Sequence, residues 1–206
     1  DGYGNPATAH DARYRRLAAL VDALRGRFTG PLYLGGASTA AVDLACREVD
    51  TYLMWGEPVA AIAERIATIR SRAARPMRFG VRIHIIARAR AADARRRAAA
   101  LIAPACVQGA RAQEYAAFDS VGQARMNAIP ADASAWVEPV LWAGIRSVRG
   151  GAGTALVGSY DEVATLLGRY REVGVDMIIA SGYPHLEEVG RVAKHVWPRI
   201  PISDAS

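Results

Sequence analysis

Residues 78–88 read RFGVRIHIIAR, and no other stretch of the chain predicts a β-strand so clearly. Two sets of side chains alternate along it, Val81, Ile83 and Ile85 against Arg82, His84 and Ile86. Alternate residues of a strand share one face of the sheet, so Arg82 and His84 lie on the same side. Burying an unpaired charge costs several kcal/mol. The two side chains therefore either point at a ligand, an anion in particular, from the carboxyl end of the strand, or meet solvent or a neighbouring carboxylate.

Composition and charge narrow the class of protein. The 206 residues carry a formal charge of +6, and 51% of them are hydrophobic, which suits one domain with a sizeable core. The basic residues are almost all arginines, and the densest group, Arg88, Arg90 and Arg95 to Arg97, has no interleaved aromatic residues. Surfaces that bind single-stranded nucleic acid combine basic residues with aromatic ones. We therefore expect a solvated helix face here and no nucleic-acid partner.

The chain shows no sign of membrane insertion, secretion or metal binding. No apolar run approaches the roughly 20 residues of a membrane span, and residues 1–16 contain no apolar signal-peptide segment. Cys46 and Cys106 lie far apart on Ala-rich stretches, as small core residues do. Their number suits a reducing compartment. We expect no membrane partner, no metal site and a cytoplasmic location.

Predicted strands alternate with predicted helices along most of the chain. The predicted strands are residues 31–34, 50–55, 78–88, 154–157 and 175–180, and the predicted helices are 8–24, 39–47, 57–74, 91–102, 113–126, 160–173 and 186–196. This alternation predicts an α/β fold with a parallel sheet and right-handed crossovers. We count four β/α units after the first helix. That is half of an eight-stranded barrel, which takes about 250 residues.

One segment is longer than an ordinary connection. Residues 104–153 interrupt the alternation and end in RSVRGGAG at 146–153, which holds Arg149 and three glycines. Most connections in compact domains have about two to six residues. We therefore interpret residues 1–206 as a single domain with an insertion or lid at 104–153, in which Arg149 is either a ligand-seeking cation or a solvated loop residue.

Candidate site residues fall where parallel strands end, at the carboxyl edge of the predicted sheet. They are Gly35 to Ser38, Trp55, Arg82 with His84, and Ser181 to His185. A strand that ends in Gly-Gly-Ala-Ser and opens a helix can hold a phosphate on backbone N–H groups. The same residues suit a tight turn with Ser38 as a plain helix N-cap. Trp55 fits a core as well as a pocket, and Tyr183 and His185 fit a structural turn.

Seven segments resemble the flavin-dependent, bacterial-luciferase-like monooxygenases, in particular the alkanesulfonate monooxygenase branch. They are HDARY (10–14), PLYLGGAS (31–38), YLMWGEP (52–58), RFGVRIHIIAR (78–88), DSVGQARM (119–126), LWAG with VRGGAGTALVG (141–158) and SGYPHLEE (181–188). They span nearly the whole chain in the family's order. The resemblance implies a (β/α)8 TIM barrel of luciferase-like type, of which this chain corresponds to the C-terminal half.

The resemblance also implies roles for particular residues. The implied catalytic residues are Arg82, His84, Tyr183 and Arg149 on the mobile loop. The implied substrate-binding residues are Trp55, Arg82, His84 and Arg149. The implied contacts to the FMN phosphate are Tyr14, Gly36, Ala37 and Ser38, with His10 in the same motif as Tyr14. An arginine presents two donors to a sulfonate and cannot lose its charge. A Gly-rich loop carrying another arginine suits a lid that excludes water.

The implied activity is that of an oxidoreductase. A two-component, FMNH2-dependent alkanesulfonate monooxygenase converts its substrate and O2 to an aldehyde and sulfite, and an NAD(P)H-dependent FMN reductase supplies the reduced FMN. Two alternatives stay open: a catalytically inactive, truncated relative that binds flavin or an anion, and a luciferase-like monooxygenase acting on another substrate.

The sequence departs from the family pattern at its amino end. The family's first four strands have no counterpart before HDARY, and neither Cys46 nor Cys106 matches the family's active-site cysteine. Half of a parallel barrel has open strand edges that invite pairing. The chain is therefore a fragment, a shortened relative, or a half-barrel that completes itself by dimerising. We expect a homo-oligomer, a dimer or a tetramer.

Overall fold

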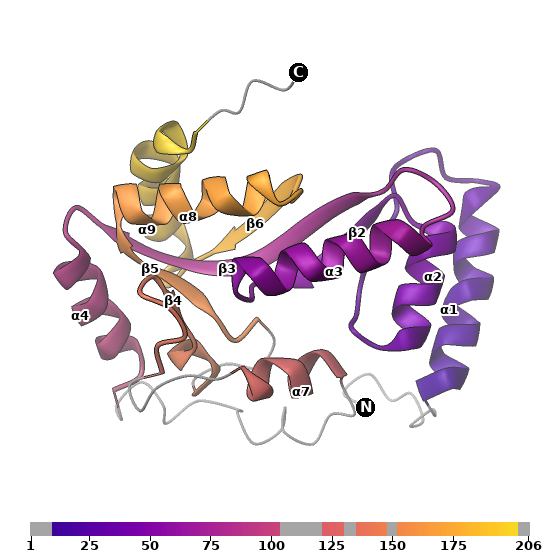
Figure 1. The fold of residues 1–206 in the computed structure, drawn as a ribbon, viewed down its shortest axis with the longest axis horizontal. Coiled ribbons are helices and arrows are strands. Elements are labelled where there is room, and N and C mark those ends of the chain that lie inside the picture. The colour runs from indigo at the N-terminus through magenta and orange to yellow at the C-terminus, as the bar shows by residue number, and fades with distance from the viewer. Residues whose placement is uncertain (1–9, 104–120, 130–134, 148–151, 202–206) are drawn as a thin grey trace.

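The computed structural model describes residues 10–103, 121–129, 135–147 and 152–201 (Figure 1). Its strands are β1 (Tyr33–Gly35), β2 (Thr51–Trp55), β3 (Arg78–Arg88), β4 (Leu141–Trp142), β5 (Ala155–Ser159) and β6 (Met177–Ser181). Its α-helices are α1 (His10–Arg25), α2 (Thr39–Glu48), α3 (Val59–Arg72), α4 (Ala91–Leu101), α7 (Val121–Ala128), α8 (Tyr160–Glu172) and α9 (His185–Arg191). Three short helical turns complete the described part: η1 (Gly144–Ser147), the π-helical η2 (Val192–Val196) and η3 (Trp197–Arg199).

The long strand β3 organises the sheet, and it begins and ends at the predicted residues. It pairs in parallel with β2 along residues 78–82, with β6 along 80–84 and with β5 along 84–88. The N–H of Gly56 donates to the carbonyl of Arg82, and the N–H of His84 donates to the carbonyl of Thr154. Alternate residues of a strand direct their backbone groups to the same edge. The strands β2 and β5 therefore follow one another along one edge of β3, and β6 occupies the other.

Four parallel strands consequently lie side by side in the order β1–β2–β3–β6. The short strand β4 pairs antiparallel with β5. The predicted parallel α/β sheet is confirmed. The strand β4 was not predicted, because two residues are too few to show an alternating pattern. The described residues contain five strand–helix units, β1–α2, β2–α3, β3–α4, β5–α8 and β6–α9. The sequence-based count of four units was therefore one too low.

Helices α3 and α8 cover one face of the sheet (Figure 1). Val81, Ile83 and Ile85 of β3 are fully buried against them, as the alternation predicted. The helices contribute residues at helical spacing: Ile62, Ile66 and Ile69 from α3, and Val163, Leu166, Leu167 and Tyr170 from α8. Each buried aliphatic side chain contributes about 1.5–3 kcal/mol of hydrophobic stabilisation. This layer is the main core of the protein.

The opposite face of the sheet is covered unevenly. Over the carboxyl half of β3, Ile86 packs with Ala94 and Ala98 of α4 and with Trp142 and Ile145. Nearer the middle of β3, Arg82 and the residues in register with it on the neighbouring strands, Trp55 and Ile179, are only half-buried. An apolar yet partly open sheet face is suited to binding a ligand.

Ser159 lies at the junction between β5 and α8, and its hydrogen bonds explain why β5 ends and α8 begins there. Its hydroxyl accepts a hydrogen bond from the N–H of Glu162, and the Glu162 carboxylate accepts one from the N–H of Ser159. This capping box satisfies two N–H groups at the start of the helix. The predicted cap is confirmed, and β5 extends two residues beyond its predicted end.

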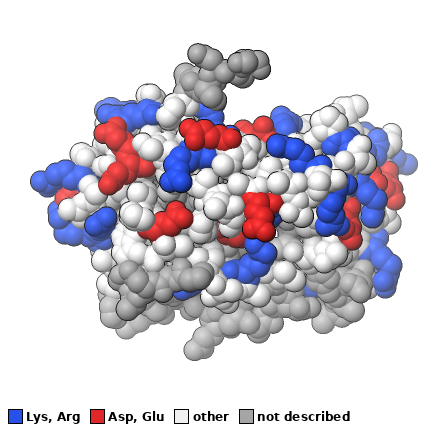
Figure 2. All heavy atoms as spheres, in the orientation of Figure 1, with Lys and Arg blue, Asp and Glu red and all other residues white. Residues whose placement is uncertain are grey.

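The arginine group on and after β3 is not the uniformly solvated face that we predicted. Arg88 forms a buried ion pair and Arg97 contacts a backbone carbonyl, whereas Arg90 and Arg96 are exposed and pair with Asp93. Elsewhere charge is dispersed: Figure 2 shows basic and acidic side chains interspersed over the visible face. None of the described helices is long and apolar enough to cross a membrane.

Candidate functional site

A row of side chains crosses three strands on the half-open face of the sheet. Trp55, the last residue of β2, is in register with Arg82 of β3, and Arg82 is in register with Ile179 of β6. All three side chains are half-buried. A Cβ atom at Gly80, one step earlier on this face, would lie 2.5 Å from Leu53 Cδ2, so the face has no room for a side chain there. Arg82 therefore lies between apolar walls that leave its charge accessible.

His84 follows Arg82 on the same face and is buried. Its ring stacks on Tyr183, with ring centroids 5.6 Å apart and an interplanar angle of 26°. Tyr183 comes from the turn after β6, where Ser181 is in register with His84. The Tyr183 ring also lies 4.8 Å from the ring of His185. The strand and the turn thus place His84 and Tyr183 in contact, with Arg82 on the same face of β3.

Two half-buried arginines hold the turn that carries Tyr183. Arg88, at the end of β3, donates to both oxygens of the Glu188 carboxylate at 2.9 and 2.6 Å. The Glu188 side chain packs on Gly182, where a Cβ would lie 2.4 Å from Glu188 Cβ. Arg97 of α4 donates to the carbonyl oxygen of Tyr183 at 3.0 Å. These contacts fix the backbone on both sides of Gly182 and thereby orient the tyrosine ring.

The turn between β1 and α2 forms a second group. Gly36 has φ +147, and a Cβ there would lie 2.8 Å from Ala41 Cβ and 2.9 Å from the Tyr14 hydroxyl oxygen. Only glycine adopts such a backbone without strain. Ser38 is buried at the N-cap of α2 and accepts a hydrogen bond from the N–H of Ala41 at 3.2 Å. Ala37 lies half-buried between the two.

Tyr52 supports this turn from below. Its hydroxyl donates to the Gly36 carbonyl, and burial raises the pKa of Tyr52 to about 12. The hydroxyl therefore stays protonated and remains a donor. A glycine turn closed by a buried serine at a helix N-terminus is a favourable place for an anion. The strand order β1–β2–β3 puts this turn two strands away from β3, about 10 Å at the usual strand spacing.

Glu57 is a buried carboxylate that sequence reasoning interpreted only as the start of a helix. It follows the carboxyl end of β2, and both its oxygens accept hydrogen bonds from Arg65 at 2.8 and 2.7 Å. Arg125 of α7 donates to it at 3.2 Å. The pair joins α7 to the end of β2, next to Trp55. A charged residue two positions after a predicted strand was the signal that could have identified it.

The predicted site residues thus form two groups, Trp55–Arg82–His84–Tyr183 and Tyr14–Gly36–Ala37–Ser38. Two predicted residues cannot be placed: Arg149 lies outside the described residues, and of His10 only the backbone, in α1, is described. The described parts of the predicted lid hold α7, β4 and η1. Among the described side chains, no group of three or more His, Cys, Asp or Glu residues is arranged to hold a metal ion.

The face around Arg82 offers a guanidinium that is always protonated, and His84 and Tyr183 can donate and accept protons beside it. Trp55 and Ile179 provide apolar surface on either side of Arg82. The first group is suited to holding an anionic organic molecule, and the turn at Gly36 to Ser38 is suited to holding a second anionic group.

Comparison with known proteins places the chain in a family. A family model described as luciferase-like monooxygenase matches residues 2–177. EDTA monooxygenase (EmoA) from Chelativorans sp. BNC1 superimposes with a TM-score of 0.69 at 16% identity, over 97% of this chain and 62% of its own. Riboflavin lyase (RcaE), solved with modified FMN and riboflavin, gives a TM-score of 0.67 at 14% identity, over 96% and 59%. DmoA from Hyphomicrobium sulfonivorans gives 0.63 at 19% identity, over 86% and 43%.

The chain spans less than two thirds of the length of each of these three proteins. At such identities the structural likeness establishes the fold, which is that of luciferase-like barrels. The family model matches most of the sequence, including β1, β2, β3 and β5. The chain therefore belongs to the luciferase-like monooxygenase family.

Proposed function

We propose that the protein acts as an FMNH2-dependent monooxygenase that desulfonates alkanesulfonates to an aldehyde and sulfite. The observation that carries this proposal is the position of Arg82, in register with Trp55 and Ile179 and next to the stacked pair His84–Tyr183. An anionic head group and an apolar tail match a guanidinium set between apolar side chains. The oxidised flavin and water are the other products.

Arg82 is the residue to which we assign the sulfonate. Its guanidinium keeps its charge at every physiological pH and presents paired N–H donors to neighbouring oxygens. The half-buried environment strengthens such charge-assisted hydrogen bonds relative to bulk water. Trp55 and Ile179 exclude water on either side and offer surface to an alkyl chain. We assign the same anion-binding role to Arg149 of the lid.

His84 and Tyr183 are the residues to which we assign proton transfer. Both side chains donate and accept protons. His84 lies one step from Arg82 along β3, and Tyr183 stacks on His84. The Arg97 and Glu188 contacts hold the tyrosine turn in place. A fixed Tyr183 side chain matters because its hydroxyl can transfer a proton only to a reacting atom within hydrogen-bond distance.

The turn at Gly36 to Ser38 is the group to which we assign the FMN phosphate, together with Tyr14 and His10. Two features of the turn suit a phosphate. The Ser38 hydroxyl is buried at the N-terminus of α2, and Gly36 leaves the backbone N–H groups accessible because it has no Cβ, which would clash with Ala41 and Tyr14. Reduced FMN, when bound, supplies the activation of O2. The chain's own part is to bind and orient both molecules and to exclude water from them.

The proposed system needs partners. We assign the supply of reduced FMN to an NAD(P)H-dependent reductase, and we expect the oxygenase to be a homo-oligomer in the cytoplasm. Riboflavin lyase, among the similar structures, was solved with modified FMN. This supports a flavin-type cofactor for the proposed site.

The test is sulfite release from a series of alkanesulfonates with reductase, NAD(P)H, FMN and O2. Arg82→Met removes the charge and should raise the KM for sulfonate about 10- to 100-fold, because a hydrogen bond to a charged group contributes about 1.5–3 kcal/mol. Arg78→Met is the matched control. Arg78 lies on the same strand and face but at its exposed amino end, so the KM should not change.

Three results would overturn the assignment in different ways. Equal KM values for the Arg82 and Arg78 variants would show that Arg82 does not bind the sulfonate. Turnover of an uncharged substrate with no sulfite from any sulfonate would favour a luciferase-like monooxygenase of other specificity. FMN binding without turnover of any substrate would favour a flavin-binding relative that has no oxygenase activity.

A further inference from the structure

Two arginines join helix α7 to the edge of the sheet where the candidate site lies. Arg125 of α7 donates to the Glu57 carboxylate at 3.2 Å, and Glu57 follows Trp55 at the end of β2. Arg146 of η1 donates to the Met126 carbonyl at 3.1 Å, and the Met126 side chain is buried. The turn η1 packs in turn on the carboxyl half of β3. Helix α7 therefore bridges two points near the carboxyl ends of β2 and β3.

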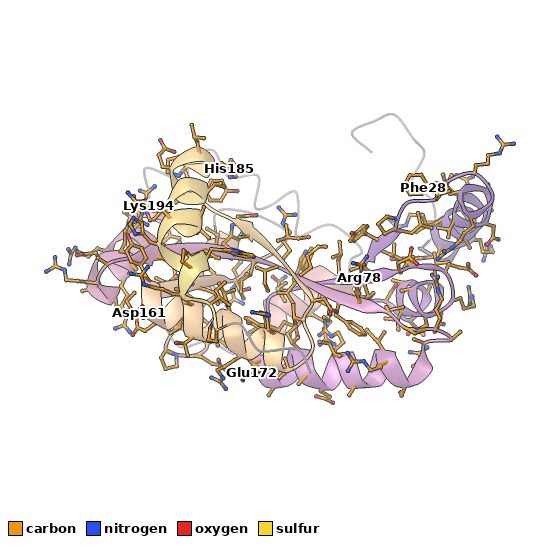
Figure 3. All side chains as sticks on the ribbon, turned by 90° about the horizontal axis from the view of Figure 1, so that it is seen from above. Phe28, Arg78, Asp161, Glu172, His185 and Lys194 are labelled. Atoms are coloured by element: carbon orange, nitrogen blue, oxygen red, sulfur yellow. The ribbon has the colours of Figure 1, made fainter. Side chains whose placement is uncertain are left out.

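The backbone that carries Glu57 is held on several sides. The N–H of Gly56 donates to the Arg82 carbonyl at 2.9 Å. The buried Thr154 hydroxyl donates to the Gly56 carbonyl at 2.7 Å. The buried Tyr170 hydroxyl of α8 donates to the Glu57 carbonyl at 2.6 Å, and Figure 3 shows α8 next to α3, the helix that begins after Glu57. The Glu57 side chain therefore extends from a fixed point beside the site strand β3.

Two arginines share the Glu57 carboxylate unequally. Arg65 of α3 donates to both of its oxygens at 2.8 and 2.7 Å, and the Arg65 side chain is 13% exposed. Arg125 donates to one oxygen and its side chain is 46% exposed, whereas that of Glu57 is 6% exposed. A buried carboxylate requires a counter-charge, and Arg65 supplies one whether or not Arg125 is in place. Departure of Arg125 therefore leaves no uncompensated buried charge.

We propose that Glu57 is a positioning residue that docks α7 at the carboxyl edge of the sheet through a releasable ion pair with Arg125. An ion pair with a partly exposed partner is weak and is screened by salt, so Arg125 can leave Glu57 and return at little cost in free energy. Arg65 keeps the carboxylate in place during both states. The pair is a property of the chain itself and does not depend on which substrate binds.

The docked position of α7 has one consequence that rests on the proposed function. With α7 in place, the strand end that carries Trp55 and Arg82 is less open to water, which monooxygenation requires. Loss of the Glu57–Arg125 pair should therefore lower the amount of sulfite released per FMNH2 oxidised. A protein that releases no sulfite in any form would contradict the proposed function, whereas amide exchange in α7 tests the ion pair itself.

Hydrogen exchange of the α7 amides, followed by mass spectrometry on the whole chain, measures the docking. Arg125→Met removes the charge and should speed this exchange about two- to fivefold, the equivalent of losing a partly exposed ion pair. Arg125→Lys keeps the charge and should restore most of the protection. Ala124→Met is the matched control, because it places the same side chain at a neighbouring exposed position of α7. It should leave the exchange unchanged, and amides of β3 should be unaffected in every variant.

Salt distinguishes an ion pair from a purely structural role of the Arg125 side chain. Raising the salt concentration from about 0.05 M to about 1 M shortens the screening length severalfold. Exchange of α7 in the unaltered chain should then rise toward that of Arg125→Met, while Arg125→Met itself should barely respond. Equal α7 exchange in these two chains at low salt would overturn the proposal. So would the same salt response in both chains, or an Arg125→Lys variant that exchanges as fast as Arg125→Met.

Discussion

Replacing Glu188 by glutamine should destabilise the protein more than any other single charge removal considered below. Glu188 is 3% exposed and Arg88 is 17% exposed, and two hydrogen bonds of 2.6 and 2.9 Å join them. Arg191 approaches the same carboxylate at 3.7 Å. The variant leaves the Arg88 guanidinium buried without its counter-charge.

The expected cost follows from that burial. Removing one partner of a buried ion pair costs about 3–5 kcal/mol, because the remaining charge is desolvated and uncompensated. For a domain of about 150–250 residues, 1 kcal/mol shifts the melting midpoint by about 2–4 °C. The Glu188→Gln variant should therefore melt about 6–20 °C below the unaltered protein. Its Tyr183 turn should also loosen, since Glu188 packs on Gly182.

Chemical and thermal unfolding of a double-mutant cycle measures this cost. Arg88→Met combined with Glu188→Gln removes both charges, so the double variant should be more stable than the sum of the two single changes predicts. Asp93→Asn is the control, because Asp93 pairs with the exposed Arg90 and Arg96, and it should leave the midpoint unchanged. A Glu188→Gln cost below about 1 kcal/mol, or strictly additive single changes, would refute the reasoning that the pair is buried and coupled.

Three further predictions concern the turn at Gly36, a helix cap and acid stability. Gly36→Ala forces a Cβ within 2.9 Å of the Tyr14 hydroxyl at φ +147, so it should cost about 1–3 kcal/mol and weaken FMN binding in a fluorescence titration; unchanged FMN affinity would contradict the proposed phosphate site. Ser159→Ala breaks the capping box of α8 and should cost about 1 kcal/mol by urea unfolding, whereas Ser71→Ala, which alters an exposed hydroxyl late in α3, should cost less. The N–H of Leu32 and the nearby Arg25 and Arg75 hold the pKa of Asp50 below its ordinary 3.8. The stability that Asp50 contributes is therefore fully present above pH 3.8 and is lost as the pH falls through its lower pKa in the folded protein. Asp50→Asn should flatten the acid limb of a curve of unfolding free energy against pH. An unaltered acid limb would show that the hydrogen bond from Leu32 to Asp50 is not formed.

The parts of the fold that follow from local pattern were predictable from the sequence. The alternation at 81–86 gave β3 and the shared face of Arg82 and His84, because side-chain direction in a strand has a period of two. Ser159 before Asp161 and Glu162 gave the start of α8. The turn at Gly36 to Ser38 was located because glycine and an N-cap serine are local requirements of a strand-to-helix turn.

The contacts between distant residues were not predictable in the same way. Arg88 and Glu188 are 100 residues apart in sequence, and no periodicity records that they meet, so Arg88 was placed on a solvated face. Glu57 with Arg125 is a similar case. The position of β6 beside β3, and not beside β5, depends on which edge of β3 was free. Pattern describes one element at a time, whereas these contacts depend on how elements pack.

The most direct test of the proposed activity is a single turnover of the purified protein. The chain, loaded with chemically reduced FMN, is mixed with oxygenated buffer that contains an alkanesulfonate, and sulfite and aldehyde are measured against FMN oxidised. The account predicts one sulfite and one aldehyde for each bound FMNH2 consumed. Oxidation of bound FMNH2 with no sulfite from any alkanesulfonate, in a folded sample, would contradict it.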